Sequence, residues 1–144
     1  MDLPRNKKTY QLRLPSQSDN LSLIRDLISK VATQAGLNNE DAGKIELAVD
    51  EACTNVIKHA YGSNSNEIID IQIKIEKTKL TIIVSDKGKG FNPDKIKIPD
   101  LNESIRTGKR GGLGICLIKT LMDKVDFQMN PGTKNQVKMV KYLT

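Results

Sequence analysis

Aromatic residues are scarce in this 144-residue sequence, which contains no tryptophan, three tyrosines and two phenylalanines. Proteins that bind RNA or single-stranded DNA often stack the bases on aromatic side chains, and none of these residues interleaves with a basic strand. With one histidine, His59, and no CxxC pair, a zinc site is not expected. Cys53 and Cys116 both lie in apolar helical patterns, so we expect two reduced thiols that act as small hydrophobic residues.

Long hydrophobic runs are absent as well. No stretch approaches the roughly 20 apolar residues that a membrane-spanning helix needs. Residues 1–8 carry charges and a proline but no apolar run, so no secretory signal is expected and a cytoplasmic location follows. An apolar share of 38% with 28% charged residues is typical of a globular protein. We therefore expect a single domain over residues 1–144, which buries roughly two thirds of its unfolded surface.

The net charge of +6 is concentrated in one segment. Between Lys87 and Arg110 there are seven basic and three acidic residues, so four of the six net charges lie there. A basic protein can bind nucleic acid through the phosphate backbone, and this interpretation stays open. The concentration of charge in one glycine-flanked loop favours a smaller, phosphate-bearing ligand.

Hydrophobic periodicity predicts the elements of the N-terminal half. Alternation predicts a strand over residues 9–14 that stops at Pro15. Helical spacing then predicts a helix over 21–35, which Gly36 ends because glycine tolerates the left-handed conformation of a C-cap. Asn38 is expected to cap a second helix, with acidic residues in its first turn.

The second helix is expected to run to about residue 60 and to end in the turn-forming tract 61–66. The later predicted elements are strands at 69–75 and 80–84, a loop at 87–110, a helix from 113, and strands at 125–129 and 137–143 around a turn at 130–133. A loop this long is usually a lid or a binding loop. The order predicts an α+β two-layer sandwich, with helices on one face of a mixed, mostly antiparallel sheet.

The first chemical motif is Glu51-Ala-Cys-Thr-Asn55 in the second helix. Glu51 and Asn55 are four residues apart, so they lie one turn above the other and flank the apolar stripe at the border of the core. A carboxylate there suits a general base, and an amide oxygen suits Mg²⁺. Taken alone, the motif favours the simpler interpretation, a solvated Glu–Asn pair on an amphipathic helix.

The second motif, Asp86-Lys-Gly88-Lys-Gly90, follows an apolar strand. Glycines allow a ligand to approach the backbone closely, and a carboxylate at a strand end can accept hydrogen bonds from an exocyclic amine such as that of adenine. The segment does not fit an EF-hand, because glycines and Lys97 occupy ligand positions. A polar strand-to-loop turn is the simpler interpretation of this motif alone.

The third motif, Arg110-Gly-Gly112-Leu-Gly114, precedes and opens a helix. A helix start exposes free N–H groups and a positive dipole end to an anion, and Arg110 can add contacts to a terminal phosphate. The motif matches neither a Walker A sequence nor a Rossmann fingerprint. Close packing of a helix on the sheet is the alternative.

His59 falls near the core stripe and is expected to be a packed histidine. Thr133, in the Pro-Gly-Thr turn, is expected to be a turn residue and is a candidate hydroxyl near a bound base.

Together, the three motifs resemble those of the GHKL ATPase superfamily, which includes gyrase, heat-shock chaperone, histidine kinase and mismatch-repair ATPases. The segments 51–62, 86–91 and 112–123 look like those of the bacterial anti-sigma factor serine kinases, which are partner-switching regulators. The resemblance extends from about residue 10 to residue 143. It implies a Bergerat fold, a histidine-kinase-like ATP-binding domain, with an ATP lid at about 87–110.

The resemblance also implies roles for single residues. Glu51 matches the general base of the family, Asn55 its magnesium ligand and Asp86 its adenine-binding carboxylate. The other matches are Gly88 and Gly90 beside adenine, Arg110, Gly112 and Gly114 at the phosphate end of the lid, and Thr133 near adenine. ATP and Mg²⁺ are the implied cofactors.

The function implied by the resemblance is that of an ATP-dependent serine kinase. Such a kinase binds a sigma factor, phosphorylates a STAS-domain anti-anti-sigma protein and frequently forms homodimers. No direct binding to nucleic acid or membrane is expected. Because no substrate-recognition element is evident in the sequence, a non-catalytic, ATP-gated binding module that acts on another partner remains the alternative.

Overall fold

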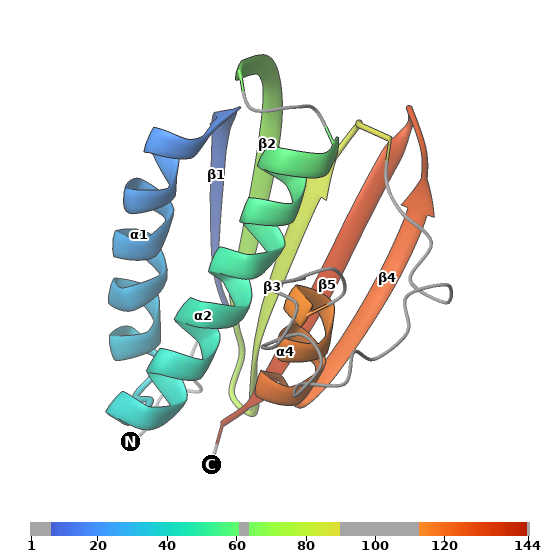
Figure 1. Ribbon diagram of the computed structural model, residues 1–144. Coiled ribbons are helices and arrows are strands. Elements are labelled where there is room, and N and C mark those ends of the chain that lie inside the picture. The colour runs from blue at the N-terminus through green and yellow to red at the C-terminus, as the bar shows by residue number, and fades with distance from the viewer. Residues whose placement is uncertain (1–6, 61–63, 90–112, 144) are drawn as a thin grey trace, which may run out of the picture.

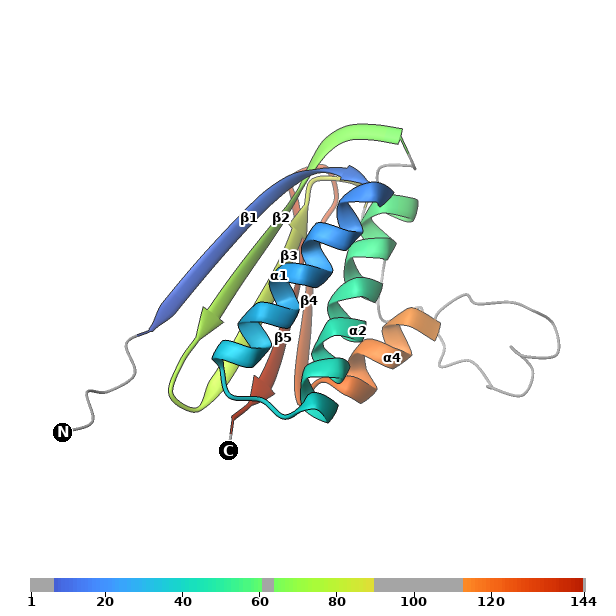
Figure 2. The same cartoon turned by 90° about the vertical axis from the view of Figure 1, so that its left-hand side faces the viewer.

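The computed structural model describes residues 7–60, 64–89 and 113–143. This part of the chain forms two layers, a five-stranded sheet and a helical layer that covers one of its faces (Figures 1 and 2). In chain order, the elements are β1 (Lys8–Gln17), the short 3-10 helix η1 (Ser18–Asn20), α1 (Leu21–Gln34), α2 (Asn39–Asn55), η2 (Val56–Ala60), β2 (Asn64–Ile75), β3 (Lys79–Asp86), α4 (Leu113–Leu121), β4 (Lys124–Asn130) and β5 (Lys134–Tyr142).

The sheet has the strand order β1-β2-β3-β5-β4, and each neighbouring pair is antiparallel. No parallel pair occurs among the described strands, so the sheet is antiparallel throughout that part of the chain and not mixed as predicted. The predicted order of elements and the predicted α+β two-layer sandwich are confirmed. Within residues 7–60, 64–89 and 113–143, no helix has the length and hydropathy to cross a membrane.

Local signals in the sequence set the ends of α1 and α2. Gly36 has a φ of +80°, and the N–H of Leu37 donates to the carbonyl of Ala32 at 3.2 Å, as in a Schellman motif. The side chain of Asn38 accepts from the N–H of Asp41 at 2.8 Å and so caps α2. Both predicted caps are confirmed.

The second predicted helix changes from α-helical to π-helical geometry near its end. The α-helical part ends at Asn55, and residues Val56–Ala60 form a π-helical turn. A π turn widens the helix by one residue per turn, and such turns are often found at functional sites. The predicted end near residue 60 is correct, but hydrophobic spacing could not show the change of helix type.

All five described strands are longer than predicted, and β1 and β2 exceed their predicted ranges the most. The strand expected to stop at Pro15 continues to Gln17, with a register shift between these two residues. Proline is tolerated there because β1 is an edge strand, so its missing N–H is not needed for the sheet. The tract 61–66 was expected to be a turn, yet β2 begins at Asn64, which pairs with Gln17. Pairing with the long edge strand outweighs the weak strand preference of asparagine and serine.

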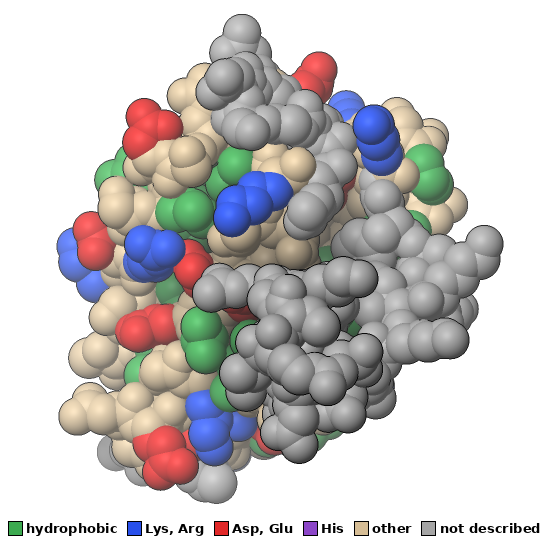
Figure 3. Space-filling view, in the orientation of Figure 1, with side chains coloured by type: hydrophobic (Ala, Val, Ile, Leu, Met, Phe, Trp, Pro, Cys, Tyr) green, Lys and Arg blue, Asp and Glu red, His purple; other side chains and the backbone are tan. Residues whose placement is uncertain are grey.

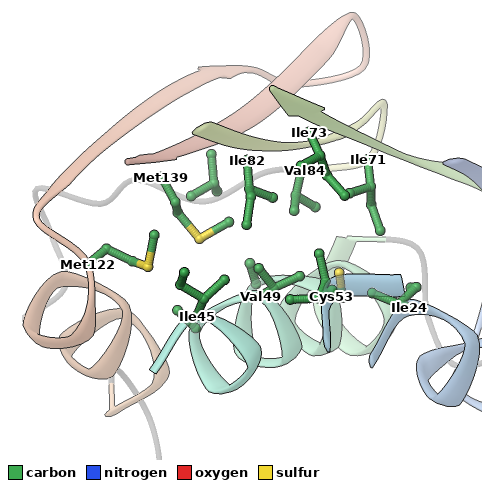
Figure 4. Close-up of a cluster of buried hydrophobic side chains, with 14 of the residues drawn as sticks. Ile24, Ile45, Val49, Cys53, Ile71, Ile73, Ile82, Val84, Met122 and Met139 are labelled. Carbon is green, nitrogen blue, oxygen red and sulfur yellow. The ribbon is translucent and has the colours of Figure 1, made fainter. Parts of the chain in front are cut away.

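The hydrophobic core lies between the helices and the sheet. In Figure 4, Ile45, Val49 and Cys53 of α2 face strand residues such as Ile82 and Met139. Each fully buried aliphatic side chain contributes about 1.5–3 kcal/mol to folding. The position of α2 on the sheet, and hence of its polar residues, is set by this packing.

Candidate functional site

Glu51 and Asn55 lie on the last turns of α2. Both are half-buried, and Ala52 and Cys53 between them are buried in the core. The two side chains therefore lie at the border of the core, as predicted. Among the described residues, no ion pair holds the carboxylate of Glu51.

Gly114, in the first turn of α4, packs directly on these two side chains. A Cβ atom placed at Gly114 would lie 2.8 Å from Oε2 of Glu51 and 3.6 Å from Oδ1 of Asn55. Because Cβ atoms essentially never approach another heavy atom within 3.0 Å, a side chain at this position would displace the carboxylate. The glycine is needed for a close approach, and this approach joins the first motif to the third.

The start of α4 gives this junction a positive character. The first N–H groups of a helix have no intrahelical partner, and the helix dipole favours an anion near them. A carboxylate and an amide oxygen lie beside this end of the nine-residue helix. The arrangement places a carboxylate and an amide oxygen, which suits a hard cation, beside N–H groups that can bind an anion.

Asp86 ends β3 and is 8% exposed. Its Oδ1 accepts from the N–H of Gly88 at 2.8 Å, which closes a tight turn, and from the amide of Asn135 at 3.0 Å. In both views of the fold, α2 and β3 end at the same side of the sandwich (Figures 1 and 2). The structure therefore brings the first and second motifs to one side of the molecule.

Asn135 was missed by the sequence analysis. It is fully buried and is the cross-strand partner of Asp86 in β5. The available signal was alternation, since Asn135, Val137 and Met139 occupy alternate, inward-facing positions along β5. A polar residue in an apolar inward row needs a partner, but the sequence could not show that this partner is Asp86.

The turn between β4 and β5 lies against the turn after β3. Gly132 has a φ of +79°, and its N–H donates to the carbonyl of Gly88 at 3.0 Å. Thr133 lies in this turn with an exposed side chain, and its N–H donates to the carbonyl of Asn130 at 2.9 Å. Thr133 is therefore a turn residue, as expected, and its role toward a bound base stays a prediction.

Several predicted site residues lie outside the described part of the chain. These are Gly90, Arg110 and Gly112, with most of the predicted lid. The side chain of His59 is likewise not described. Their roles stay predictions.

An ion pair lies beside the first motif on the helical face. Nε of Arg25 in α1 donates to Oδ1 of Asp50 in α2 at 2.7 Å, and this hydrogen bond raises the pKa of the guanidinium. Over α1 and α2, acidic and basic side chains are interspersed (Figure 3). The pair ties the two helices together, one residue before Glu51.

Both cysteines are free thiols. Cys53 is buried, and burial raises its pKa, with a further contribution from the negative charge of Asp50. A thiol of this kind is inert, as predicted. Cys116 is half-buried on α4.

A separate cleft of about 370 Å³ is lined by outward-facing residues of the sheet, such as Arg13, Ile83 and Ser85, on the face away from the core. It contains side chains of both charges, and its lining residues are Gln11, Arg13, Glu67, Ile68, Asp70, Gln72, Ile83, Ser85, Asp86, Lys87, Lys134 and Gln136. Only Asp86 belongs to the candidate site, and neither Glu51 nor Asn55 takes part. This cleft is therefore not the junction of α2 and α4.

Known proteins are similar to this chain in sequence. Residues 14–141 match the histidine kinase-like ATPase domain family. The chain is 39% identical over 138 residues to the serine-protein kinase RsbW of Staphylococcus aureus. The aligned region covers 92% of this chain and 86% of that protein. The protein of the same name from strain Newman is 38% identical over the same length.

A solved structure shows the same fold. The RsbU and RsbW domains of Rv1364c from Mycobacterium tuberculosis match with a TM-score of 0.67 at 13% identity. The match covers 93% of this chain, which spans 31% of that longer protein. The predicted family is confirmed: the chain belongs to the histidine kinase-like ATPases and, among them, to the family of the serine-protein kinase RsbW.

Proposed function

We propose that this protein is a cytoplasmic, ATP-dependent serine kinase that phosphorylates a STAS-domain protein and binds a sigma factor, so that phosphorylation switches its partner. The observation that carries the proposal is the packing of Gly114 on Glu51 and Asn55, on the fold of the histidine kinase-like ATPases. The relatives named serine-protein kinase support the type of reaction.

The proposed reaction is an in-line phosphoryl transfer. The serine hydroxyl of the substrate attacks the γ-phosphorus of ATP, the bond to the bridging oxygen breaks and ADP leaves. Glu51 accepts the hydroxyl proton as general base. The free N–H groups at the start of α4 stabilise the charge on the phosphoryl oxygens. Transfer needs positioning and charge more than covalent chemistry, and the junction of α2 and α4 supplies both.

Mg²⁺ fits the residues at this junction. Asn55 offers an amide oxygen, which is a hard ligand, close to the end of α4 where phosphate is expected. Mg²⁺ usually keeps waters and takes few protein ligands, so one amide oxygen with phosphate oxygens suffices. When bound, the ion neutralises charge on the phosphates.

The adenine ring of ATP is proposed to bind at Asp86, whose carboxylate accepts a hydrogen bond from the amino group of adenine. Gly88 and Gly90 allow the backbone to approach the base, and Thr133 offers a hydroxyl from the adjacent turn. At the other end of the nucleotide, Arg110, Gly112 and Gly114 are proposed to bind the phosphates.

A homodimer is part of the proposal. The uncovered face of the sheet presents paired charges, such as Arg13 and Asp70 at 3.2 Å, and a surface with both signs can complement its own copy. Sedimentation analysis should give twice the mass of one chain. A protein that sediments as a monomer at micromolar concentration would contradict this part alone.

The direct test is transfer of a labelled γ-phosphate from ATP to STAS-domain proteins of the same genome, in the presence of Mg²⁺. We expect label on one such protein, and none when its acceptor serine is replaced by alanine. Co-purification should identify the sigma factor bound in the absence of transfer. If ATP binds but no STAS-domain protein is labelled, the protein is a non-catalytic, ATP-gated binding module.

A further inference from the structure

Asn135 lies beside Asp86, and no motif in the sequence includes it. Its Nδ2 group donates to Oδ1 of Asp86 at 3.0 Å and to the carbonyl of Gly88 at 2.9 Å. Asn135 is fully buried, so these bonds form away from solvent. The amide therefore links the carboxylate to the turn that follows β3.

The chemistry of its neighbours fixes the orientation of this amide. Both contacted atoms are acceptors, so only the NH₂ end of Asn135 can face them. Its Oδ1 points elsewhere and is buried with no hydrogen-bond partner within the described residues. Buried acceptors normally bind a protein donor, an ordered water or a ligand.

Two donors converge on one oxygen of Asp86. Besides Asn135, the N–H of Gly88 donates to Oδ1 at 2.8 Å. Neither bond uses Oδ2, so the two bonds fix the rotation of the carboxylate and leave Oδ2 for a ligand. Gly88 is itself held, because its carbonyl also accepts from Gly132 at 3.0 Å. The direction in which Oδ2 points is thus set by the hydrogen bonds among Asp86, Gly88, Gly132 and Asn135, which together form one corner of the site.

We propose that Asn135 is a positioning residue that makes this corner selective for a base with an exocyclic amino group over one with a carbonyl at the same place. The inference rests on the proposed ATP binding. Oδ2 of Asp86 is an acceptor that the bonds from Gly88 and Asn135 do not use, and an amino group donates to such an atom. The carbonyl of hypoxanthine is itself an acceptor and is repelled. Without Asn135, the carboxylate rotates and the discrimination weakens.

The first experiment compares the binding of ATP and inosine triphosphate to the full chain. Asn135→Ala is expected to weaken ATP binding about tenfold, the effect of misplacing one hydrogen bond to a charged group, and to change inosine triphosphate binding little. The matched control is Gln136→Ala, the next residue of β5, which should keep the wild-type ratio of affinities.

The outcomes separate the two levels of the proposal. Equal losses for both nucleotides, or no loss for either, would mean that Asn135 only supports the fold, and the positioning role would be wrong. A wild-type protein that binds neither nucleotide would overturn the proposed function itself. Thermal unfolding of each variant shows whether it is folded.

A second variant keeps the test decisive if Asn135→Ala does not fold. Asn135→Asp has the same shape but places two carboxylates side by side, so the pair holds a shared proton at a raised pKa. When that proton is bound, the new side chain can donate to Asp86 as the amide did. The charged neighbours in the chain, Lys87 and Lys134, are unchanged.

For Asn135→Asp, the ratio of ATP to inosine triphosphate affinity should recover about fivefold between about pH 8 and about pH 5.5. Both nucleotides carry the same triphosphate, so the ratio removes its titration, and the wild-type ratio should stay constant. A ratio that does not depend on pH in the variant would overturn the proposal.

Discussion

At the residue scale, the size of one side chain controls the position of another. Gly114 leaves room for the carboxylate of Glu51, which lies 2.8 Å from the place that a Cβ atom at position 114 would occupy. The carboxylate is the far end of a flexible side chain, so it can move without disturbing the backbone. A change at Gly114 should therefore affect catalysis and spare the fold.

Gly114→Ala should lower phosphoryl transfer about 10- to 100-fold, because small displacements of catalytic groups cost this much. The free energy of unfolding should be unchanged or slightly higher, since alanine is more favourable than glycine within a helix by about 1 kcal/mol. Transfer rates and thermal unfolding check both parts. Gly43→Ala in α2 is the matched control: nothing lies within 4 Å of its added Cβ, so it should gain stability and keep full activity. Unchanged transfer in Gly114→Ala would contradict the packing.

The sequence predicted single residues unevenly. Glu51, Asn55 and Asp86 could be selected as candidates because their motifs have a fixed spacing and a chemical meaning, and their roles stay predictions. Asn135 could not, because its importance comes from the pairing of β3 with β5, and a cross-strand partner 49 residues away leaves no local pattern. Predicting it requires the strand register, which sequence periodicity does not give.

At the element scale, capping residues decide where the helices end and therefore where α2 starts. Gly36 takes a left-handed conformation that directs the chain from α1 into the Asn38 cap of α2. These signals are local, so the sequence was sufficient to predict them. The π turn after Asn55 and the extensions of β1 and β2 depend on packing and pairing between distant segments, so they were not predictable from local preference.

Gly36→Ala should lower the free energy of unfolding by about 1–2 kcal/mol, because in the left-handed conformation the Cβ atom of any residue other than glycine is crowded by its own backbone. Nothing lies within 4 Å of the added Cβ, so the loss comes from the backbone alone. Urea unfolding measures the change, with Gly43→Ala again as the reference. A stabilising effect like that expected at Gly43 would show that the cap does not depend on glycine.

At the scale of the whole molecule, the sandwich brings together segments that are far apart in the sequence. The core fixes α2 on the sheet, α4 packs beside α2, and the turns after β3 and β4 are joined by hydrogen bonds. Element order and layers were predictable from hydrophobic patterns. The meeting of the motifs was not, and it was expected only from the resemblance to a known family.

One measurement tests the central claim that phosphoryl transfer takes place where α2 meets α4. It is the single-turnover transfer rate of Glu51→Gln, with ATP affinity measured in parallel and Glu46→Gln on the same helix as control. We predict that Glu51→Gln lowers the transfer rate at least about 100-fold, the usual contribution of a general base, and retains ATP binding. Glu46→Gln should transfer phosphate at the wild-type rate. Transfer by Glu51→Gln at the wild-type rate would contradict the claim.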